Sequence, residues 1–170
     1  ETDKLPILLH FSTDEVYGDI TEGEHIETDI LKPSNPYSAT KAAADQLITA
    51  WGRTYNIPYV ILRPTNNYGV GQYTKKIPLH NNGDPIRNWL HAQDTANAVL
   101  TIIDSKVKNE IYNICGGFEQ SNWDTVDKII TLYQGEDKEL QTTFPYYDED
   151  KNQFLDFSYS RIGQDVRYAL

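Results

Sequence analysis

Apolar residues gather in two short runs that polar alternation does not interrupt. Residues 6–12 (PILLHFS) and 59–63 (YVILR) are compact apolar runs, the pattern of a buried strand. Between them, residues 36–55 carry small and apolar side chains at helical spacing. Asn35 followed by Pro36 is a typical helix start. A strand, a helix and a second strand in this order predict a right-handed crossover in a parallel sheet that helices cover on both faces.

The second half of the chain shows the same signals. Residues 92–104 and 122–134 predict two further helices, the second with Ser121 as its cap, and residues 110–115 predict a strand. The tail from residue 142 onward is polar and aromatic. The predicted fold class is therefore α/β with a parallel sheet.

Charge and cysteine content narrow the classes of partner. The 170 residues carry a net charge of -10, which argues against nucleic acid or an anionic membrane surface as partner. The single cysteine, Cys115, excludes an internal disulfide, and no apolar run approaches the length of about 20 residues that spans a bilayer. We expect a cytoplasmic protein. The four histidines lack metal-ligand spacing, so no metal is expected. The absence of Met, even at position 1, suggests a start inside a longer chain.

A tyrosine and a lysine stand four residues apart at the start of the first predicted helix. This spacing puts Tyr37 and Lys41 on one helix face. A nearby ammonium favours the tyrosinate form, which can take a proton from a sugar hydroxyl while hydride leaves the same carbon. A solvated helix face would show the same spacing, and Tyr147 and Lys151 share it in the acidic tail.

Polar residues follow both predicted strands at their carboxyl ends, where open α/β sheets bind ligands. Residues 12–18 include the adjacent carboxylates Asp14 and Glu15, which can act as acid and base if their environments separate their pKa values. Residues 63–69 include two adjacent asparagines, whose amides can donate to a pyrophosphate or a carboxamide. Ordinary turns would also account for both runs.

Together these segments resemble the dTDP-glucose 4,6-dehydratases, a family of extended short-chain dehydrogenases/reductases. The matching stretches are STDEVYGD (12–19), NPYSATKAAAD (35–45), RPTNNYG (63–69), IRNWLHAQD (86–94), YNICGG (112–117) and RIGQDVRYAL (161–170). They follow the family's order and span almost the whole chain. The resemblance implies part of a Rossmann-type parallel sheet with a smaller C-terminal substrate-binding α/β portion, NAD as cofactor, a nucleotide sugar as substrate, and a homodimer.

The resemblance also implies the catalytic roles. Tyr37 would deprotonate the sugar 4-hydroxyl as hydride passes to NAD, Lys41 would hold the nicotinamide ribose, and Thr13 would bind the 4-oxygen. Glu15 would then remove the C5 proton, and Asp14 would protonate the departing C6 hydroxyl. Return of the hydride to C6 would give a 4-keto-6-deoxy sugar nucleotide.

Further matching positions imply binding roles. The cofactor contacts would be Ser12, Tyr37, Lys41 and Asn67. The substrate contacts would be Thr13, Asn66, His80, Arg87, Asn113 and Arg161. Arg87 would pair with the diphosphate through its bidentate guanidinium. A surface salt bridge for Arg87 and a plain strand-end position for Asn113 stay open as alternatives.

The chain also departs from the family pattern. We assign residues 1–73 to the Rossmann portion and residues 74–170 to the substrate portion, with some Rossmann elements near residues 86–104. The Gly-x-x-Gly-x-x-Gly turn that receives the NAD pyrophosphate does not occur, so we expect a longer parent or a complementing chain to supply it. Only residues 74–77 stand where the family has a longer stretch, and Gln164 stands where it has His.

Two other hypotheses stay open. A UDP-sugar dehydratase, epimerase or decarboxylase of the same fold would share much of this pattern, although plain epimerases lack the Asp14–Glu15 pair. A non-catalytic remnant without the NAD-binding half would keep the motifs and lose the activity.

Overall fold

The computed structural model describes residues 5–69, 77–134, 155–158 and 165–170. Some sequence predictions fall outside these ranges: the domain boundary between residues 73 and 74, the substrate contact Arg161, the position of Gln164, and the pair Tyr147 and Lys151. In the described part of the chain, no helix is both long enough and apolar enough to cross a membrane.

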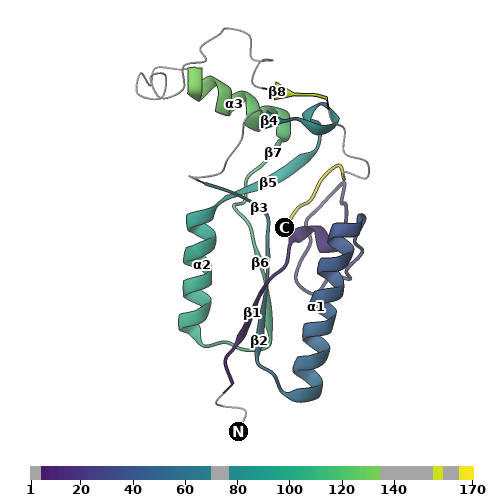
Figure 1. The fold of residues 1–170 in the computed structure, drawn as a ribbon, viewed down its shortest axis with the longest axis vertical. Helices are drawn as coiled ribbons and strands as arrows, with labels where there is room; N and C mark the ends of the chain where they lie inside the picture. The colour runs from purple at the N-terminus through teal and green to yellow at the C-terminus, as the bar shows by residue number, and fades with distance from the viewer. Residues whose placement is uncertain (1–4, 70–76, 135–154, 159–164) are drawn as a thin grey trace.

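A three-stranded parallel sheet forms the centre of the molecule. Its order is β1 (Leu8–Phe11), β2 (Tyr59–Pro64), β6 (Glu110–Ile114). Helix α1 (Pro36–Tyr55) lies on one side of the sheet and α2 (Ala92–Ser105) on the other (Figure 1). All residues of β2 are buried because strands flank it and helices cover it. The α/β fold class and the parallel sheet are confirmed.

The core beneath α2 is built from the apolar runs that predicted the strands. Its buried members are Val60, Leu62, Leu90 and Ile114. The predicted strands and helices form within about two residues of the expected bounds, because each apolar run ends at a polar or turn-forming residue.

Cap residues fix both ends of α1, and the sequence suggested the first of them, Asn35. Asn35 Oδ1 accepts a hydrogen bond from Ser38 N at 2.9 Å, and Ser38 Oγ accepts one from Asn35 N at 3.2 Å. This reciprocal pair is a capping box. The helix ends at Asn56, which adopts the left-handed conformation with φ 55°.

A second layer lies above the carboxyl ends of the parallel strands. It holds a sheet of order β3 (Asn66–Tyr68), β5 (Ile86–His91), β7 (Glu119–Ser121), a pair β4 (Ile77–Pro78) with β8 (Leu155–Asp156), and helix α3 (Asn122–Gln134). An apolar cluster of this layer consists of Leu79, Val126, Ile130 and Leu155. The predicted cap of α3 is confirmed, since Ser121 Oγ accepts from Asp124 N at 2.9 Å. The sequence did not predict the short strands.

The last six residues return to the first part of the chain. Val166 O accepts a hydrogen bond from Ile86 N at 2.7 Å, and Ala169 O accepts one from His25 N at 3.0 Å. The C-terminus therefore lies beside the short 3-10 helix η2 (Asp14–Tyr17) and the start of α1 (Figure 1).

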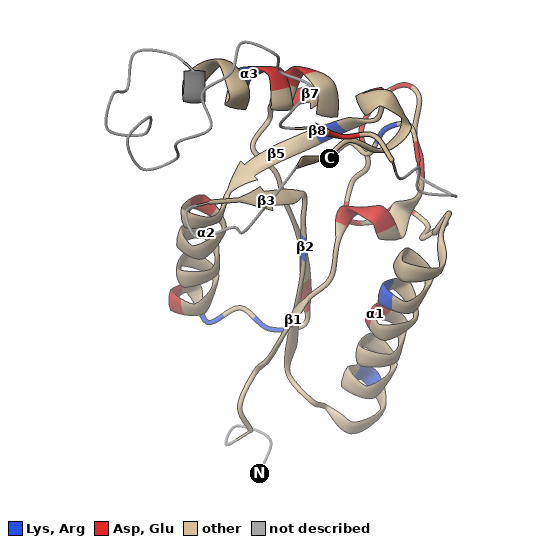
Figure 2. Cartoon of the chain, turned by 45° about the horizontal axis from the view of Figure 1, so that its top comes forward, with Lys and Arg blue, Asp and Glu red and all other residues tan. Residues whose placement is uncertain are grey.

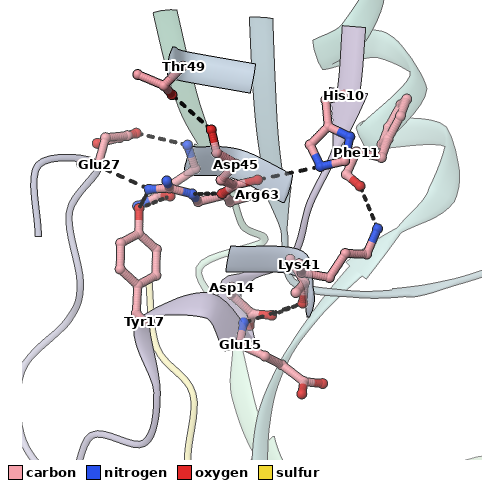
Figure 3. Close-up of polar contacts among 12 residues, drawn as sticks. His10, Phe11, Asp14, Glu15, Tyr17, Glu27, Lys41, Asp45, Thr49 and Arg63 are labelled. Atoms are coloured by element: carbon pink, nitrogen blue, oxygen red, sulfur yellow. Dashed lines mark hydrogen bonds and ion pairs between the residues drawn. The ribbon is translucent and has the colours of Figure 1, made fainter. Parts of the chain in front are cut away.

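A buried ion pair joins α1 to the central strand. Arg63 Nε donates to Asp45 Oδ2 at 3.0 Å, and neither side chain is more than 3% exposed (Figure 3). Arg63 Nη1 also donates to the Tyr17 hydroxyl at 2.6 Å, which donates in turn to Asn113 Oδ1 at 2.8 Å. Burial raises the pKa of Tyr17, so its hydroxyl keeps the proton that this chain of bonds needs.

Loss of the Asp45 charge should destabilise the protein strongly. In Asp45→Asn the side-chain volume stays nearly constant but Arg63 becomes a buried unpaired charge, so the free energy of unfolding should fall by about 3–5 kcal/mol. Urea unfolding followed by Trp fluorescence measures this. The exposed carboxylate of Asp104 provides the control, since Asp104→Asn should change stability by less than about 0.5 kcal/mol. Equal midpoints for Asp45→Asn and the parent would contradict the prediction.

Candidate active site

The candidate catalytic residues meet where β1 and β2 end. Turn η2 directly follows β1, and α1 begins close to it. Figure 2 shows the acidic residues of this turn close to the C-terminus. This is the edge of the sheet at which open α/β folds place their ligands.

Thr13 and Asp14 form the buried side of this turn. Thr13 Oγ1 accepts from Glu15 N at 3.3 Å and donates to Asp14 Oδ1 at 3.1 Å. The Asp14 side chain is only 3% exposed. Burial raises the pKa of Asp14 to about 7, although the hydrogen bond from Thr13 opposes the rise. Near neutral pH a large fraction of this carboxyl therefore keeps a proton that it can donate.

Glu15 lies in a different environment. It is only partly buried, and its Oε2 accepts a hydrogen bond from Asn35 Nδ2 at 3.1 Å. The two adjacent carboxyl groups therefore have different surroundings, one enclosed and one partly exposed.

Tyr37 and Lys41 lie in the first turns of α1, and the predicted helical spacing is confirmed. The Tyr37 side chain is 46% exposed. Lys41 Nζ donates to Phe11 O at 2.8 Å (Figure 3). The ammonium is thereby held at the end of β1, next to the acidic turn.

Arg87 of β5 is buried at the same place. Its side chain is 6% exposed and donates to the carbonyl oxygens of Ile86 at 2.7 Å and Asp165 at 3.0 Å. Burial lowers the pKa of its guanidinium, whereas the charges of Glu15 and Asp14 act in the opposite direction. The alternative of a surface salt bridge for Arg87 is therefore wrong, because the group is enclosed and bonded to backbone.

Known proteins share this arrangement. The family model described as the NAD dependent epimerase/dehydratase family matches residues 2–115. The chain belongs to this family. It is 34% identical to dTDP-glucose 4,6-dehydratase of Escherichia coli and 37% identical to that of Neisseria gonorrhoeae, with 95% of this chain and 50% of each relative covered. The structure of DesIV, a dTDP-glucose 4,6-dehydratase from Streptomyces venezuelae with NAD bound, matches at TM-score 0.78 and 31% identity over 96% of this chain and 51% of that one.

These findings confirm the resemblance and the Rossmann-type fold. The chain spans about half the length of the curated relatives that it matches. The dehydratase activity of these relatives belongs to proteins about twice as long.

The family is described as NAD dependent. The residues at the end of β1 and along α2 suit the nicotinamide end of this cofactor. Ser12 Oγ is buried and has no hydrogen-bond partner among the described residues. A mainly apolar cavity of about 520 Å³ lies beside it, between the end of β1 and α2. It is lined by Phe11, Asn67, Ala92, Thr95, Ala96, Val99 and Leu100. Asn67 Nδ2 is held by Thr65 O at 2.9 Å, and its Oδ1 accepts from Thr95.

The predicted substrate contacts are not all gathered at this place. Both ends of the Asn113 amide are bonded within the chain, to the Tyr17 hydroxyl at 2.8 Å and to His25 O at 3.3 Å. Asn66 lies in β3, partly exposed, and His80 begins the turn η3 (His80–Gly83) of the second layer. Their contacts with substrate stay predictions.

Two residues of this site were not predicted from the sequence. Asn35 was assigned only as a helix cap, and its amide also binds Glu15. Tyr168 is 2% exposed, and its hydroxyl lies 3.5 Å from Glu15 Oε2. The matching stretch 161–170 pointed to the segment, but no local pattern indicates a contact across 153 positions. No group of three or more His, Cys, Asp or Glu side chains suited to a metal occurs among the described residues.

The raised pKa of Asp14 gives stability a pH dependence of definite sign. Between its ordinary value of 3.8 and about 7, folded Asp14 holds a proton that the unfolded chain has released. Its contribution is complete below 3.8 and is lost as the pH rises to about 7, by up to roughly 4 kcal/mol. Asp14→Asn should therefore gain stability relative to the parent as pH rises through this window. Urea unfolding of both proteins at a series of pH values measures the difference, and a difference independent of pH would refute the assignment.

Proposed function

We propose that the full-length protein is an NAD-dependent dehydratase that converts dTDP-glucose to dTDP-4-keto-6-deoxyglucose, a step in deoxysugar formation and a lyase reaction. The observation that carries this proposal is the pair Asp14 and Glu15, adjacent in sequence but held in environments that suit a proton donor and a proton acceptor. The similarity to dTDP-glucose 4,6-dehydratases over 95% of this chain supports the substrate.

Oxidation at C4 would come first. When bound, NAD would accept the hydride from C4 and later return it to C6. The Tyr37 phenolate would take the proton of the 4-hydroxyl, assisted by the positive charge of Lys41 at the end of β1. Thr13 would bind the same oxygen. Its hydroxyl would then turn from Asp14, to which it now donates.

Elimination of water would follow. The new 4-ketone acidifies the proton on C5, and Glu15 would remove it. As the C6–O bond breaks, Asp14 would give its proton to the leaving hydroxyl, which departs as water. The buried, protonated state of Asp14 near pH 7 supports this role. Glu15 would return its proton to C5 when C6 is reduced.

The residues that match the family's binding motifs would bind the cofactor and the nucleotide sugar. Ser12, Lys41 and Asn67 would hold the nicotinamide end of NAD. Asn66, His80, Arg87, Asn113 and Arg161 would hold the nucleotide sugar. The guanidinium of Arg87 is charged and enclosed, which suits a diphosphate, but it would have to exchange backbone carbonyls for phosphate oxygens.

The homodimer and the cytoplasmic location stay predictions. The exposed side chains of Leu47 and Trp51, four residues apart on α1, support pairing of this helix with a second copy. Neither a plain epimerase nor a non-catalytic remnant requires a buried Asp14 with a raised pKa, so this residue favours the dehydratase.

Replacing Tyr37 should remove the first step. In the full-length protein, Tyr37→Phe should lower the turnover of dTDP-glucose by about 10²–10⁴-fold, because no group then takes the 4-hydroxyl proton. The assay follows the 4-keto-6-deoxy product after incubation with NAD. Tyr55→Phe is the matched control, since Tyr55 ends the same helix and is 64% exposed.

Three results of this assay discriminate between the hypotheses. Product from the parent and the control but not from Tyr37→Phe supports the proposal. A 4-epimer or a decarboxylated sugar in place of the 6-deoxy product would assign the protein to another branch of the fold. No turnover of any nucleotide sugar, together with no NAD binding, would support the non-catalytic remnant.

A further inference from the structure

The C-terminal segment places one buried hydroxyl beside the proposed base. Tyr168 Oη lies 3.5 Å from Glu15 Oε2 and accepts a hydrogen bond from Asn35 Nδ2 at 3.2 Å. A phenol has one proton to donate. The Tyr168 hydroxyl donates this proton to Glu15 Oε2.

Asn35 cannot turn its amide around to change this arrangement. Its Oδ1 accepts from Ser38 N in the first turn of α1. Nδ2 therefore faces three acceptors, which are Glu15 Oε2, Tyr168 Oη and Asp165 Oδ2 at 3.2 Å. Both donors meet Oε2 of Glu15. Oε1 accepts no hydrogen bond from the residues that the structure describes. One oxygen of the carboxylate is thus held while the other is free to take a proton.

The ring of Tyr168 is also held in place by its surroundings. It is 2% exposed and lies against the Arg87 guanidinium, whose central carbon is 4.6 Å from the ring centre. On the preceding residue, Arg167 N donates to Asp19 Oδ1 at 2.7 Å, and Arg167 Nη2 pairs with Glu119 Oε2 at 2.9 Å. The segment is therefore anchored to the loop after η2 and to β7, and Tyr168 has little freedom to move.

We propose that Tyr168 is a positioning residue for Glu15 in the elimination step. The inference rests on the proposed function. Tyr168 holds Oε2 so that Oε1 points to the C5 proton, and it does not touch the reacting atoms. Oxidation at C4 uses Tyr37 and not Glu15, so loss of the Tyr168 hydroxyl slows deprotonation of C5 and leaves the first hydride transfer unchanged.

The variant Tyr168→Phe tests this in the full-length protein, because it keeps the ring against Arg87 and removes only the oxygen. We expect turnover of dTDP-glucose to fall about 5–20-fold, as for loss of one hydrogen bond to a charged group. The KM should change less than about twofold, since substrate contacts are kept. Reduced cofactor should accumulate transiently in a single turnover, because C4 oxidation then outruns elimination.

Tyr112→Phe is the matched control. Tyr112 packs against the core beneath α2 and takes no part in the site, so the variant should match the parent in turnover and in transient reduced cofactor. Thermal unfolding of both variants checks that each is folded at the assay temperature.

A double-mutant comparison separates positioning from a general structural effect. If Tyr168 acts through Glu15, adding Tyr168→Phe to Glu15→Gln should cause no further loss of turnover. If Tyr168→Phe lowers turnover in the Glu15→Gln background by the same factor as in the parent, the proposal is overturned. The same holds if Tyr168→Phe alone lowers turnover but no reduced cofactor accumulates. Unchanged kinetics in Tyr168→Phe alone would overturn it while the proposed function stands. If the parent gives neither reduced cofactor nor product, the proposed function fails and this inference fails with it.

Discussion

The buried guanidinium of Arg63 is the constraint on which the site's geometry depends. It lies at the end of β2 and binds Asp45 of α1, the Tyr17 hydroxyl of η2, and the Glu27 carbonyl at 3.4 Å. A buried charge must be satisfied on every side, because leaving it unpaired costs several kcal/mol. One side chain therefore fixes β2, α1 and the acidic turn relative to one another (Figure 3).

Burial also creates the chemical difference between the two carboxyl groups. Asp14 and Glu15 are neighbours in the chain, but the 3-10 turn directs one side chain inward and leaves the other partly exposed. Desolvation then raises the pKa of Asp14 to about 7. The fold thus gives two neighbouring carboxyl groups different surroundings, as the proposed roles of proton donor and proton acceptor require.

The C-terminal segment closes this arrangement from the other side. Residues 165–170 supply the carbonyl of Asp165 to Arg87 and the hydroxyl of Tyr168 to Glu15. Asn35 links both to α1 through its cap. The acidic turn, α1 and residues 165–170 are thus one hydrogen-bonded unit, so the position of Glu15 depends on residues that are distant in the sequence.

The sequence by itself determined the elements whose signals are local. The two apolar runs predicted β1 and β2, and residues 110–115 predicted β6. The Asn-Pro pair predicted the start of α1, and the four-residue spacing put Tyr37 and Lys41 on one helix face. The order of these elements predicted the parallel sheet. It also predicted that the candidate site lies at the carboxyl ends of the strands. The family motifs added the roles, because such motifs retain chemistry that periodicity alone does not carry.

Tertiary structure alone decided what depends on distant partners. Strands β3 and β7 have only three residues each, and β5 mixes polar and apolar side chains, so their pairing with one another is needed to make them strands. The pKa of Asp14 follows from burial, the amide of Asn113 is used by the Tyr17 network, and Tyr168 reaches Glu15 from 153 positions away. Local patterns fix backbone conformation over a few residues, whereas desolvation and long-range hydrogen bonds exist only once the chain has folded.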